Sequence, residues 1–392
     1  MVDIRQNSIT SNESIHVLHI ASGDLWAGAE VMLYTLAKTL YKELNTQVSI
    51  VLLNHGILEQ RLSNCGISVH VLDESRLSSF QILQQLNKII DELKPEVIHT
   101  HRIKENIIGS IAALYNHRIP SLRTVHGAPE HRPPLHQLPK HLILFLNWLF
   151  GRYYQRYIIA VSPDLAKKLE HDFPKTRIRV IENGVDIDSL THHISHSPSK
   201  NTDKTGYRIG IAGRLVPVKR VDLFIESAFY LKQHHPELSI HFHIYGDGPL
   251  SDNLQAQVRS QQAEDYIHFE GHCENIAQHL GTLDALLMTS DHEGLPMVLL
   301  EAMCLKIPII AHAVGGIPHL LDQGRCGVLV QNQTAKAFAE AIVKLINQPE
   351  QYEQLAQLAL ERVNHNYSAS STADAYLKVY KILSAREPPI HN

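Results

Sequence analysis

One stretch decides how this chain folds: Glu293-Gly294-Leu295-Pro296-Met297-Val298-Leu299-Leu300-Glu301. Pro296 has a fixed φ angle and no N–H, so it suits the first turn of a helix. We therefore expect Glu293 in the loop before this helix and Glu301 inside it. The free N–H groups of the Gly-Leu-Pro turn would face outward at the positive end of the helix dipole, which favours phosphate binding.

A short apolar run precedes this turn. Residues 285–290, with the sequence Ala-Leu-Leu-Met-Thr-Ser, are typical of a buried parallel strand. The turn then lies at the carboxyl end of that strand, which is where ligands of open α/β sheets bind. The two features together predict a site for a phosphate-bearing ligand.

Strand and helix patterns alternate along the chain in two series, which is the signature of two βαβ domains. A polar bridge rich in Ser, His, Thr and Lys separates the series at 191–206. The apolar, β-rich runs of the first series are 15–21, 48–53, 69–72, 97–100, 122–126 and 157–161. Those of the second series are 207–213, 240–245, 267–270, 285–289, 307–312 and 328–330. Helical periodicity is clearest at 31–43, 80–93, 336–347, 352–364 and 370–384.

The predicted domain boundaries follow from this alternation. We expect a disordered tail at 1–13, a first Rossmann-like domain at 14–186, a linker at 187–206 and a second Rossmann-like domain at 207–369. A length of 392 residues suits two such domains better than one ordinary core.

The composition is that of a globular protein, with 44% hydrophobic and 19% charged residues. A net charge of -4 lacks the clustered basic excess of nucleic-acid-binding proteins, which disfavours that class. Four widely spaced cysteines without a C-x-x-C pattern indicate neither a disulfide framework nor a zinc ribbon. A reducing cytoplasm fits best, and the polar residues 1–13 lack the apolar segment of a secretory signal.

The longest mostly apolar run, 142–150, is far shorter than a membrane-spanning helix. It contains Trp148 and is flanked by Lys140, Arg152 and Arg156, which is typical of a helix at a membrane surface. A helix packed on the sheet explains the apolar residues as well and is the more frequent case. Both alternatives stay open for 140–156, and a membrane contact would place the protein at the inner face of the membrane.

Histidine pairs at His99/His101 and His241/His243 each lie on one face of a predicted strand. They raise the question of a metal site, but no H-E-x-x-H pattern or carboxylate cluster accompanies them. Structural histidines with satisfied hydrogen bonds are the favoured interpretation. Asp186-Ile187-Asp188 has a D-x-D spacing, yet its place in a hinge favours turn chemistry over metal binding.

One glycine-containing turn follows the first predicted strand in each half of the chain. The loop 22–30 contains Gly23 and Gly28, which let the backbone approach a ligand closely, although a plain βα turn would also use them. The loop is not G-x-G-x-x-G, which argues against a dinucleotide-binding dehydrogenase. In the second half, 212–220 places Arg214 and Lys219 where both cations would converge on a diphosphate; the alternative is a pair of solvated surface cations.

Two further glycine turns, Gly246-Asp247-Gly248-Pro249 and Val314-Gly315-Gly316-Ile317-Pro318, lead into predicted helices of the second half. Several helix N-termini should therefore face one cleft.

In this order, the motifs resemble those of the family 4, GT-B type glycosyltransferases. The resemblance rests on Gly213-Arg214-Leu215 with Lys219, Gly246-Asp247-Gly248-Pro249, Glu293-Gly294-Leu295-Pro296 with Glu301-Ala302-Met303, Asn183-Gly184-Val185-Asp186 and Thr124-Val125-His126-Gly127. It extends from about residue 15 to residue 384. The resemblance implies two Rossmann-like domains facing each other across a cleft, with the last helix, 370–385, crossing back to the first domain. It also implies transfer from a nucleoside diphosphate sugar, UDP- or GDP-linked, with retention of configuration and without a metal or other cofactor.

The resemblance also assigns roles. Arg214 and Lys219 would hold the diphosphate and stabilise the departing nucleotide, and Glu301 would accept hydrogen bonds from the ribose hydroxyls. Glu293 would meet the donor sugar, and His126 would lie beside the reacting centre. The residues implied to contact the nucleotide sugar are Gly28, Gly213, Arg214, Lys219, Gly246, Gly294, Leu295, Pro296 and Glu301.

The acceptor is less defined by the sequence. Arg102, in an individual loop of the first half, is the candidate acceptor contact. A glycan, a lipid-linked sugar or a small molecule would each fit the resemblance, with a bacterial surface-polysaccharide or glycolipid pathway as the expectation. Two other functions share the plan: a nucleotide-sugar 2-epimerase-like enzyme, and a non-catalytic module that binds a sugar nucleotide.

Overall fold

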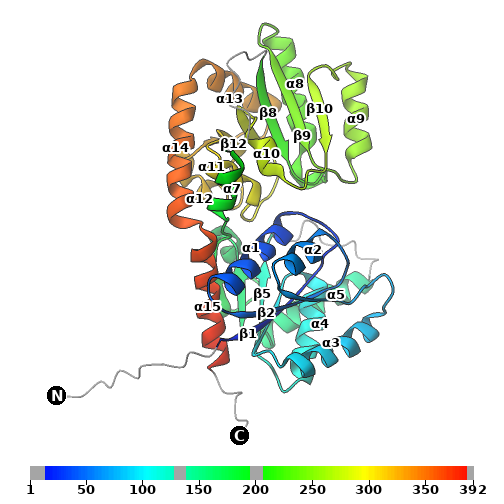
Figure 1. Cartoon of the computed structure of the whole chain (residues 1–392). Helices are drawn as coiled ribbons and strands as arrows, with labels where there is room; N and C mark the ends of the chain where they lie inside the picture. The colour runs from blue at the N-terminus through cyan, green and yellow to red at the C-terminus, as the bar shows by residue number, and fades with distance from the viewer. Residues whose placement is uncertain (1–13, 128–137, 195–205, 386–392) are drawn as a thin grey trace, which may run out of the picture.

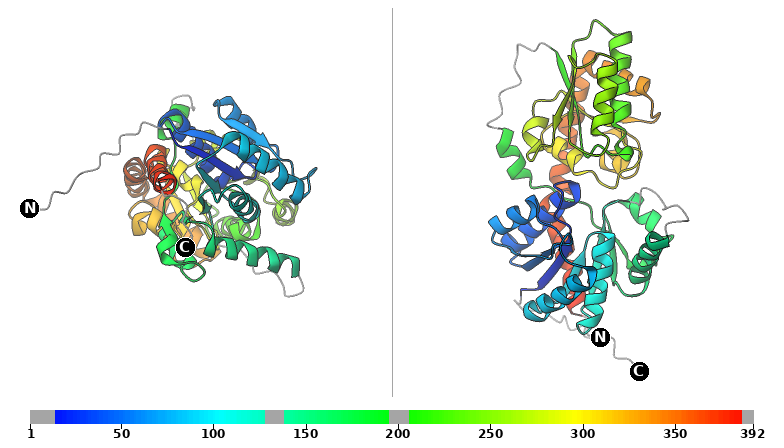
Figure 2. Two further views of the ribbon diagram at one scale, coloured as in Figure 1. Left: turned by 90° about the horizontal axis from the view of Figure 1, so that it is seen from below. Right: turned by 90° about the vertical axis from the view of Figure 1, so that its right-hand side faces the viewer.

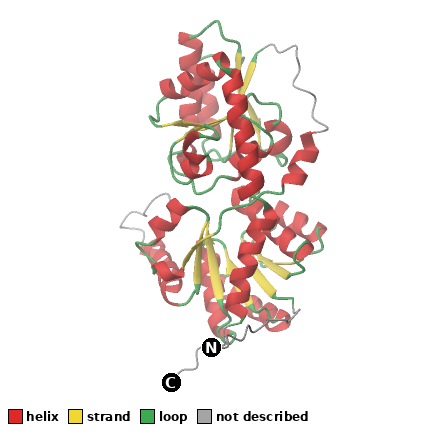
Figure 3. Ribbon diagram, turned by 90° about the vertical axis from the view of Figure 1, so that its left-hand side faces the viewer, coloured by secondary structure: helices red, strands yellow, loops and turns green. Residues whose placement is uncertain are grey.

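The computed structural model describes residues 14–127, 138–194 and 206–385. Two parallel α/β domains lie one above the other (Figure 1), and helices lie on both sides of each sheet (Figure 3). The expectations for the tail 1–13, and for the part of the linker at 195–205, concern residues outside this range.

The first domain contains a seven-stranded parallel sheet in the order β3-β2-β1-β4-β5-β6-β7. Its strands are β1 His16–Ala21, β2 Gln47–Leu52, β3 Ser68–Val71, β4 Val97–Thr100, β5 Ser121–Val125, β6 Tyr157–Ala160 and β7 Ile178–Val180. Most of these strands are buried on both faces, which is why they read as continuous apolar runs. The strand order reverses beside β1, and ligands of doubly wound sheets bind at such a switch point.

Six helices cover this sheet in the described residues before the linker: α1 Gly28–Lys42, α2 Ile57–Asn64, α3 Ser79–Leu93, α4 Ile103–Tyr115, α5 Leu138–Tyr153 and α6 Pro163–Leu169. Local sequence starts several of them. Ser78 and Gln81 form a capping box at α3, and the Ser162 hydroxyl accepts the Leu165 N–H at α6. A 3-10 turn, η1 Lys175–Arg177, leads into β7.

The second domain contains a six-stranded parallel sheet in the order β10-β9-β8-β11-β12-β13. Its strands are β8 Tyr207–Ala212, β9 Ile240–Tyr245, β10 Ile267–Gly271, β11 Ala285–Met288, β12 Ile309–His312 and β13 Val328–Val330. Its helices are α8 Val221–His234, α9 Ser251–Ser260, α10 Ile276–Leu280, α11 Met297–Cys304, α12 Ile317–Leu320 and α13 Ala335–Asn347, with 3-10 turns η2 Pro217–Lys219 and η3 Asp322–Gly324. The predicted fold class of two Rossmann-like domains is confirmed.

The last two helices join the domains. α14, Pro349–Asn366, packs on α11 of the second domain, and α15, Ala369–Ser384, packs on α1 and β4 of the first. The right-hand view of Figure 2 shows this final, red helix running behind the lower domain. The prediction of a last helix that crosses back is therefore confirmed.

Two segments of the chain pass side by side between the domains. The Val185 N–H donates to the Tyr367 carbonyl at 2.9 Å, and the Ala369 N–H donates to the Val185 carbonyl at 2.9 Å. The predicted linker starts with a helix, α7 Ile187–Ile194, which packs on α10 and α11. The crossing segments are thus hydrogen-bonded to each other, and the linker is structured where it is described.

None of the helices in the described parts of the chain combines the length and the apolarity needed to cross a membrane.

Candidate active site

A cleft of about 900 Å³ lies between the domains, at the carboxyl ends of both sheets. It is lined by every residue that the sequence assigned to the donor or to the reacting centre: Gly28, His126, Gly213, Arg214, Lys219, Gly246, Glu293, Gly294, Leu295, Pro296 and Glu301. Arg102 is not among the lining residues. The fold therefore brings together residues from five separate motifs.

The turn before α11 holds a buried carboxylate. Glu293 is 9% exposed and accepts hydrogen bonds from Lys219 Nζ at 2.6 Å and from Ser290 Oγ at 2.6 Å. A buried carboxylate needs such a cationic partner to stay charged. Lys219 has three N–H donors, of which Glu293 takes one, so the ammonium retains donors on the side of the cleft.

Arg214 is placed differently. Its side chain is exposed on the wall of the cleft, and no carboxylate among the residues that the structure describes forms an ion pair with it. A guanidinium presents a fork of donors that suits two oxygens of a phosphate. Arg214 and Lys219 thus add two positive charges to one side of the cleft.

Glycine is required where the turns of the second domain touch. Gly213, Gly246 and Gly315 have φ angles of 152°, 139° and 59°, which side chains rarely adopt. A Cβ atom on Gly246 would also overlap the carbonyl oxygen of Gly213, and one on Gly315 would overlap that of Glu293. These close backbone contacts fix the positions of the turns at the cleft relative to each other.

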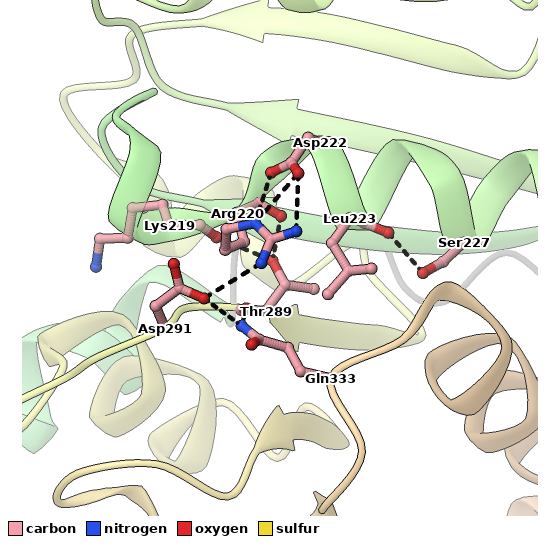
Figure 4. A network of polar contacts seen from close by, with 8 residues as sticks. All are labelled: Lys219, Arg220, Asp222, Leu223, Ser227, Thr289, Asp291 and Gln333. Carbon is pink, nitrogen blue, oxygen red and sulfur yellow. Dashed lines mark hydrogen bonds and ion pairs between the residues drawn. The ribbon is translucent and has the colours of Figure 1, made fainter.

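The turn that carries Lys219 is supported by polar contacts behind it (Figure 4). Arg220 lies in the left-handed region at a φ of 50° and pairs with Asp222 at 3.0 Å and Asp291 at 3.3 Å. The Thr289 hydroxyl lies 3.0 Å from the Lys219 carbonyl and 2.9 Å from that of Arg220. Residues that follow β11 therefore fix the backbone from which the Lys219 side chain extends.

His126 follows β5 and belongs to the first-domain wall of the cleft. Its carbonyl oxygen lies so close to Gly294 of the second domain that a Cβ there would overlap it. Enclosure by protein lowers the pKa of His126 to about 4, with a smaller contribution from the Arg102 cation. The imidazole is therefore neutral at neutral pH, although part of its surface faces the cleft.

Glu301 lies on α11, with its carboxyl group in the wall of the cleft. Burial raises the pKa of this carboxyl to about 7, because a charged form in this environment loses its hydration.

Asn183 of the first domain donates its side-chain N–H to the Leu295 carbonyl at 3.0 Å. This bond links the domain bridge to the turn that begins α11.

The first-domain loop 22–28 is held at both ends by buried glutamates that the sequence analysis did not select. The Ser22 hydroxyl donates to Glu105 at 2.6 Å, and the Ala27 N–H donates to Glu30 at 3.3 Å. Burial raises the pKa of both carboxyls. Glu30 occupies the third position of α1 and accepts the N–H of the N-cap residue Ala27, but alanine lacks the hydroxyl of a capping box, so the sequence pattern that would reveal Glu30 is incomplete.

Arg102 forms an ion pair with this buried Glu30 and lies 3.9 Å from Asp24. Its described contacts therefore hold the start of α1 and the loop before it. Its assignment as an acceptor contact stays a prediction.

The cleft also has aromatic and cationic lining that the sequence analysis did not name, from Trp26, Tyr34, Lys38 and Arg61. The Arg61 guanidinium lies over the Trp26 ring, at 4.2 Å from its centroid. Arg61 Nη2 also donates to the Glu274 carbonyl at 3.3 Å, which connects the two domains. Trp26 lies within the glycine loop, which is the signal that could have identified it.

Three histidines lie close enough to share a metal ion: the ligand atoms of His19, His99 and His101 are within 4.8 Å of one another. The His99 nitrogens, however, already lie 2.7 Å from Tyr380 Oη and 2.8 Å from Thr124 Oγ1. A metal would have to displace such hydrogen bonds. These contacts support the interpretation of structural histidines.

The other two metal candidates are also engaged in hydrogen bonds. His243 Nδ1 lies 2.7 Å from Glu270, and His241 Nδ1 lies 3.3 Å from His268 Nε2. Asp186 accepts the Ser189 N–H at 3.1 Å at the start of α7 and pairs with Lys38 at 2.6 Å. The prediction of turn chemistry for this aspartate is confirmed.

Two Rossmann-like domains across a glycine-lined cleft define the GT-B class of protein. Among solved structures, Anabaena Alr3699/HepE in complex with UDP-glucose has a TM-score of 0.80 at 20% identity, covering 94% of this chain and 100% of that chain. Sucrose-phosphate synthase from Thermosynechococcus elongatus has a TM-score of 0.74 at 17% identity, covering 95% and 99%. At these identities the likeness shows the fold.

The family is shown by the sequence. The model described as Glycosyltransferase Family 4 matches residues 26–189, and the model described as Glycosyl transferases group 1 matches residues 194–362. The chain belongs to the glycosyltransferases of the family 4 type. The predicted resemblance is confirmed over both halves.

Curated relatives are distant. Poly(ribitol-phosphate) alpha-N-acetylglucosaminyltransferase of Staphylococcus aureus is 26% identical over 224 residues, which are 57% of this chain and 43% of that protein. UDP-Gal:alpha-D-GlcNAc-diphosphoundecaprenol alpha-1,3-galactosyltransferase of Escherichia coli is 26% identical over 282 residues, 69% of this chain and 71% of that protein. The chain thus spans less than half the length of the first of these relatives.

Proposed function

We propose that this protein transfers a sugar from a nucleoside diphosphate sugar to a carbohydrate or lipid-linked acceptor, with retention of configuration. The observation that supports the proposal best is the second-domain wall of the cleft. There, Arg214, Lys219 and the start of α11 surround the space beside the buried Glu293. Family membership favours the same reaction.

The positive groups of this wall suit the departure of a nucleoside diphosphate. The Arg214 guanidinium binds two phosphate oxygens, and Lys219 contributes a compact charge. The N–H groups at the start of α11 add the positive end of a helix dipole. These groups offset the negative charge that develops on the leaving phosphate. They do for the leaving group what a divalent cation does in metal-dependent transferases, so no metal is required.

The nucleoside lies toward Glu301 in this proposal. Ribose hydroxyl groups donate to its carboxylate, and a carboxylate that gains such donors becomes easier to ionise. Binding of the donor therefore lowers the pKa of Glu301 from its raised value. UDP is the preferred nucleotide, because the Anabaena structure contains UDP-glucose and the name of the Escherichia coli relative specifies UDP-Gal.

The sugar lies between Glu293 and His126. Glu293 accepts a hydrogen bond from a sugar hydroxyl while Lys219 neutralises its charge. The neutral imidazole of His126 lies on the opposite wall and exchanges a hydrogen bond with the sugar beside the reacting carbon. Retention rests on the resemblance to the family, and the anomeric configuration of the product, read by proton NMR, tests it directly.

The acceptor belongs to the first domain, and helix α5 indicates a lipid-linked one. Leu138, Leu142, Phe145 and Tyr153 are 73%, 58%, 53% and 58% exposed on α5. The sequence from 138 to 157 contains no acidic residue. Phe150 is buried against the domain, so the helix packs on the fold by one face and leaves the other apolar. Such a helix with cationic ends suits the surface of an anionic membrane.

Liposome flotation tests this contact. We expect the wild-type protein to bind vesicles of phosphatidylglycerol and phosphatidylethanolamine, and expect a Leu142→Ser, Phe145→Ser double variant to bind them less while it keeps donor binding. Tyr115, which is 74% exposed on α4, provides the control Tyr115→Ser, with unchanged flotation. An absence of wild-type binding would remove the membrane contact from the proposal.

Calorimetric binding tests the donor site. UDP, GDP, ADP and their common sugar conjugates are titrated in EDTA and then in magnesium. We expect UDP or its sugar conjugates to bind equally well in both. Binding that needs magnesium would overturn the metal-free site, and binding of none would favour a degenerate, non-catalytic module. Formation of an epimerised nucleotide sugar without any acceptor would instead support the epimerase-like alternative.

A further inference from the structure

A chain of three histidine rings leads from the interior of the first domain to the cleft. His19 lies on β1, His101 follows β4 and His126 follows β5, and these three strands are neighbours in the sheet. His19 Nδ1 lies 3.1 Å from His101 Nε2, and His101 Nδ1 lies 3.4 Å from His126 Nε2. Both neighbouring pairs of rings are stacked. The chain connects a fully buried imidazole to one that lines the cleft.

The three rings are neutral at neutral pH. Burial lowers the pKa of His19 to about 3 and that of His101 well below its ordinary value, and enclosure lowers that of His126 to about 4. A neutral imidazole has one N–H and one acceptor nitrogen. Each link needs one donor and one acceptor, so all three protons must point in the same direction along the chain.

The inner end of the chain favours one direction. His19 Nε2 is buried, and no hydrogen-bond partner is found for it among the described residues. If His19 donates through Nδ1 to His101, the protons are directed toward the cleft and His19 Nε2 is an acceptor without a hydrogen bond. If the protons are directed the other way, His19 Nε2 carries the proton and is a buried N–H without a partner. Among buried backbone groups, N–H groups without a partner are rarer than under-satisfied carbonyl groups, and we apply the same preference to the imidazole. The protons therefore point from His19 toward His126.

We propose that His19 and His101 are positioning residues that fix His126 in the tautomer with its proton on Nδ1, oriented as a hydrogen-bond donor of the cleft wall. This inference deepens the proposed glycosyl transfer and, for its effect on rate, rests on it. The role of His126 is then to donate to an oxygen of the donor sugar, since its Nε2 is already occupied as an acceptor by His101. His99 stays outside the chain, because its nitrogens face Tyr380 and Thr124.

Replacing His101 by asparagine or glutamine distinguishes a role in orienting His126 from a role in packing alone. An Asn side chain puts its amide near Nδ1 of the replaced ring and preserves a donor for His126, whereas Gln puts its amide near Nε2. We expect His101→Asn to retain most of the rate, and His101→Gln and His101→Phe to lower kcat about 10–100-fold, the range found for partners that orient a histidine at metal sites. KM for the donor should change less than about threefold in all three.

Nitrogen-15 NMR of histidine-labelled protein reads the tautomer without any turnover. We expect the proton of His126 on Nδ1 in the wild type and in His101→Asn, and a mixture of tautomers in His101→Phe and His19→Phe. His243→Phe is the matched control, because His243 is also buried with an unpartnered Nε2 but lies in the second domain. It should change neither the His126 signals nor kcat.

A wild-type proton on Nε2, or an unchanged tautomer in folded His101→Phe, would overturn the inference, as would equal kcat values for the Asn and Gln variants. If the wild type transferred no sugar from any donor, the proposed function would fail, while the NMR comparison would still decide whether the chain orients His126. His19→Phe provides the same NMR test if His101→Phe does not fold.

Discussion

The two walls of the cleft are held in place by different means. In the second domain, backbones touch: Gly246 packs against the Gly213 carbonyl with no room for a side chain. In the first domain, the Gly23 carbonyl also meets Gly56 closely, but side chains from distant segments hold the same loop as well, as Ser22 does with Glu105. A backbone contact requires glycine and therefore leaves a local motif. A side-chain contact across 83 positions leaves no local pattern, so more of the second-domain wall than of the first-domain wall can be predicted from sequence.

The largest effect is expected from Lys219→Ala, which removes a cation from the donor wall. Turnover should fall about 100–1,000-fold, as on loss of one group that stabilises a developing anion, and the protein should stay folded. Steady-state kinetics with circular dichroism measures both. Lys336→Ala is the control, because Lys336 is an exposed lysine of the same domain, 3.8 Å from Glu340. Unchanged turnover in Lys219→Ala would remove this residue from the mechanism.

Gly246→Ala tests whether backbone contact holds the donor wall. A methyl group here would overlap the Gly213 carbonyl, at a φ of 139° that alanine rarely adopts. We expect a loss of stability of about 2–4 kcal/mol, in the range of overpacking combined with backbone strain. Gly127→Ala is the control in the first-domain wall, since a Cβ there meets nothing within 4 Å. Chemical denaturation of both variants would contradict the comparison if their midpoints were equal.

Glu301→Gln tests the second-domain wall through the pH dependence of the free energy of unfolding. The folded-state pKa of about 7 lies above the ordinary value of 4.5, so the native state binds the proton more tightly than the unfolded state. The ionised carboxyl therefore costs stability as pH rises from 4.5 to 7, by about 3 kcal/mol at most.

We expect the stability of Glu301→Gln relative to the wild type to grow between pH 5 and pH 8, while its affinity for the nucleotide falls. Urea denaturation at both pH values measures the first effect, and calorimetry the second. A stability difference independent of pH would show that Glu301 ionises normally in the folded protein.

The smallest effect is expected at Arg220, where strain and ion pairs oppose each other. Arg220→Gly relieves the left-handed backbone, worth about 1 kcal/mol, but removes exposed ion pairs worth about 0.2–1 kcal/mol each. The net change should be within about 1 kcal/mol. Arg220→Ala loses the ion pairs without relief of strain and should be the less stable of the two by thermal unfolding. The reverse order would mean that the position is unstrained.

Sequence predicted the core of the fold well because buried parallel strands are continuous apolar runs. The predicted strands at 97–100 and 240–245 have the same limits as β4 and β9. β7 was not predicted, because it has three residues with Arg179 in the middle and is mostly exposed. The predicted helix start at Pro296 is one residue early, since Pro296 is the N-cap of α11.

The candidate site was predicted where a local motif exists. All of the residues that the sequence assigned to the donor line the cleft, because they lie in the turns after the strands or in the helices that begin there. Glu30 and Ser290 bond to residues only three positions away, but neither pair forms a standard sequence motif. Glu105 was not selected either, since only the folded chain brings Ser22, 83 positions away, near it. The same reason limits Arg102: its loop is visible in the sequence, but its pairing with Glu30 is not. The domain boundaries at 186 and 207 stay predictions.

The returning helix α15 sets the order in which this protein can be completed during synthesis. Its Tyr376 and Tyr380 are buried inside the first domain, where Tyr380 meets His99 and Tyr376 meets Thr124. These tyrosines leave the ribosome only after every element of the second domain has been made. The core of the first domain is therefore completed only after the second domain has been translated. A nascent chain that stops before residue 369 exposes the surface of α1 that α15 covers, and chaperones can bind it there.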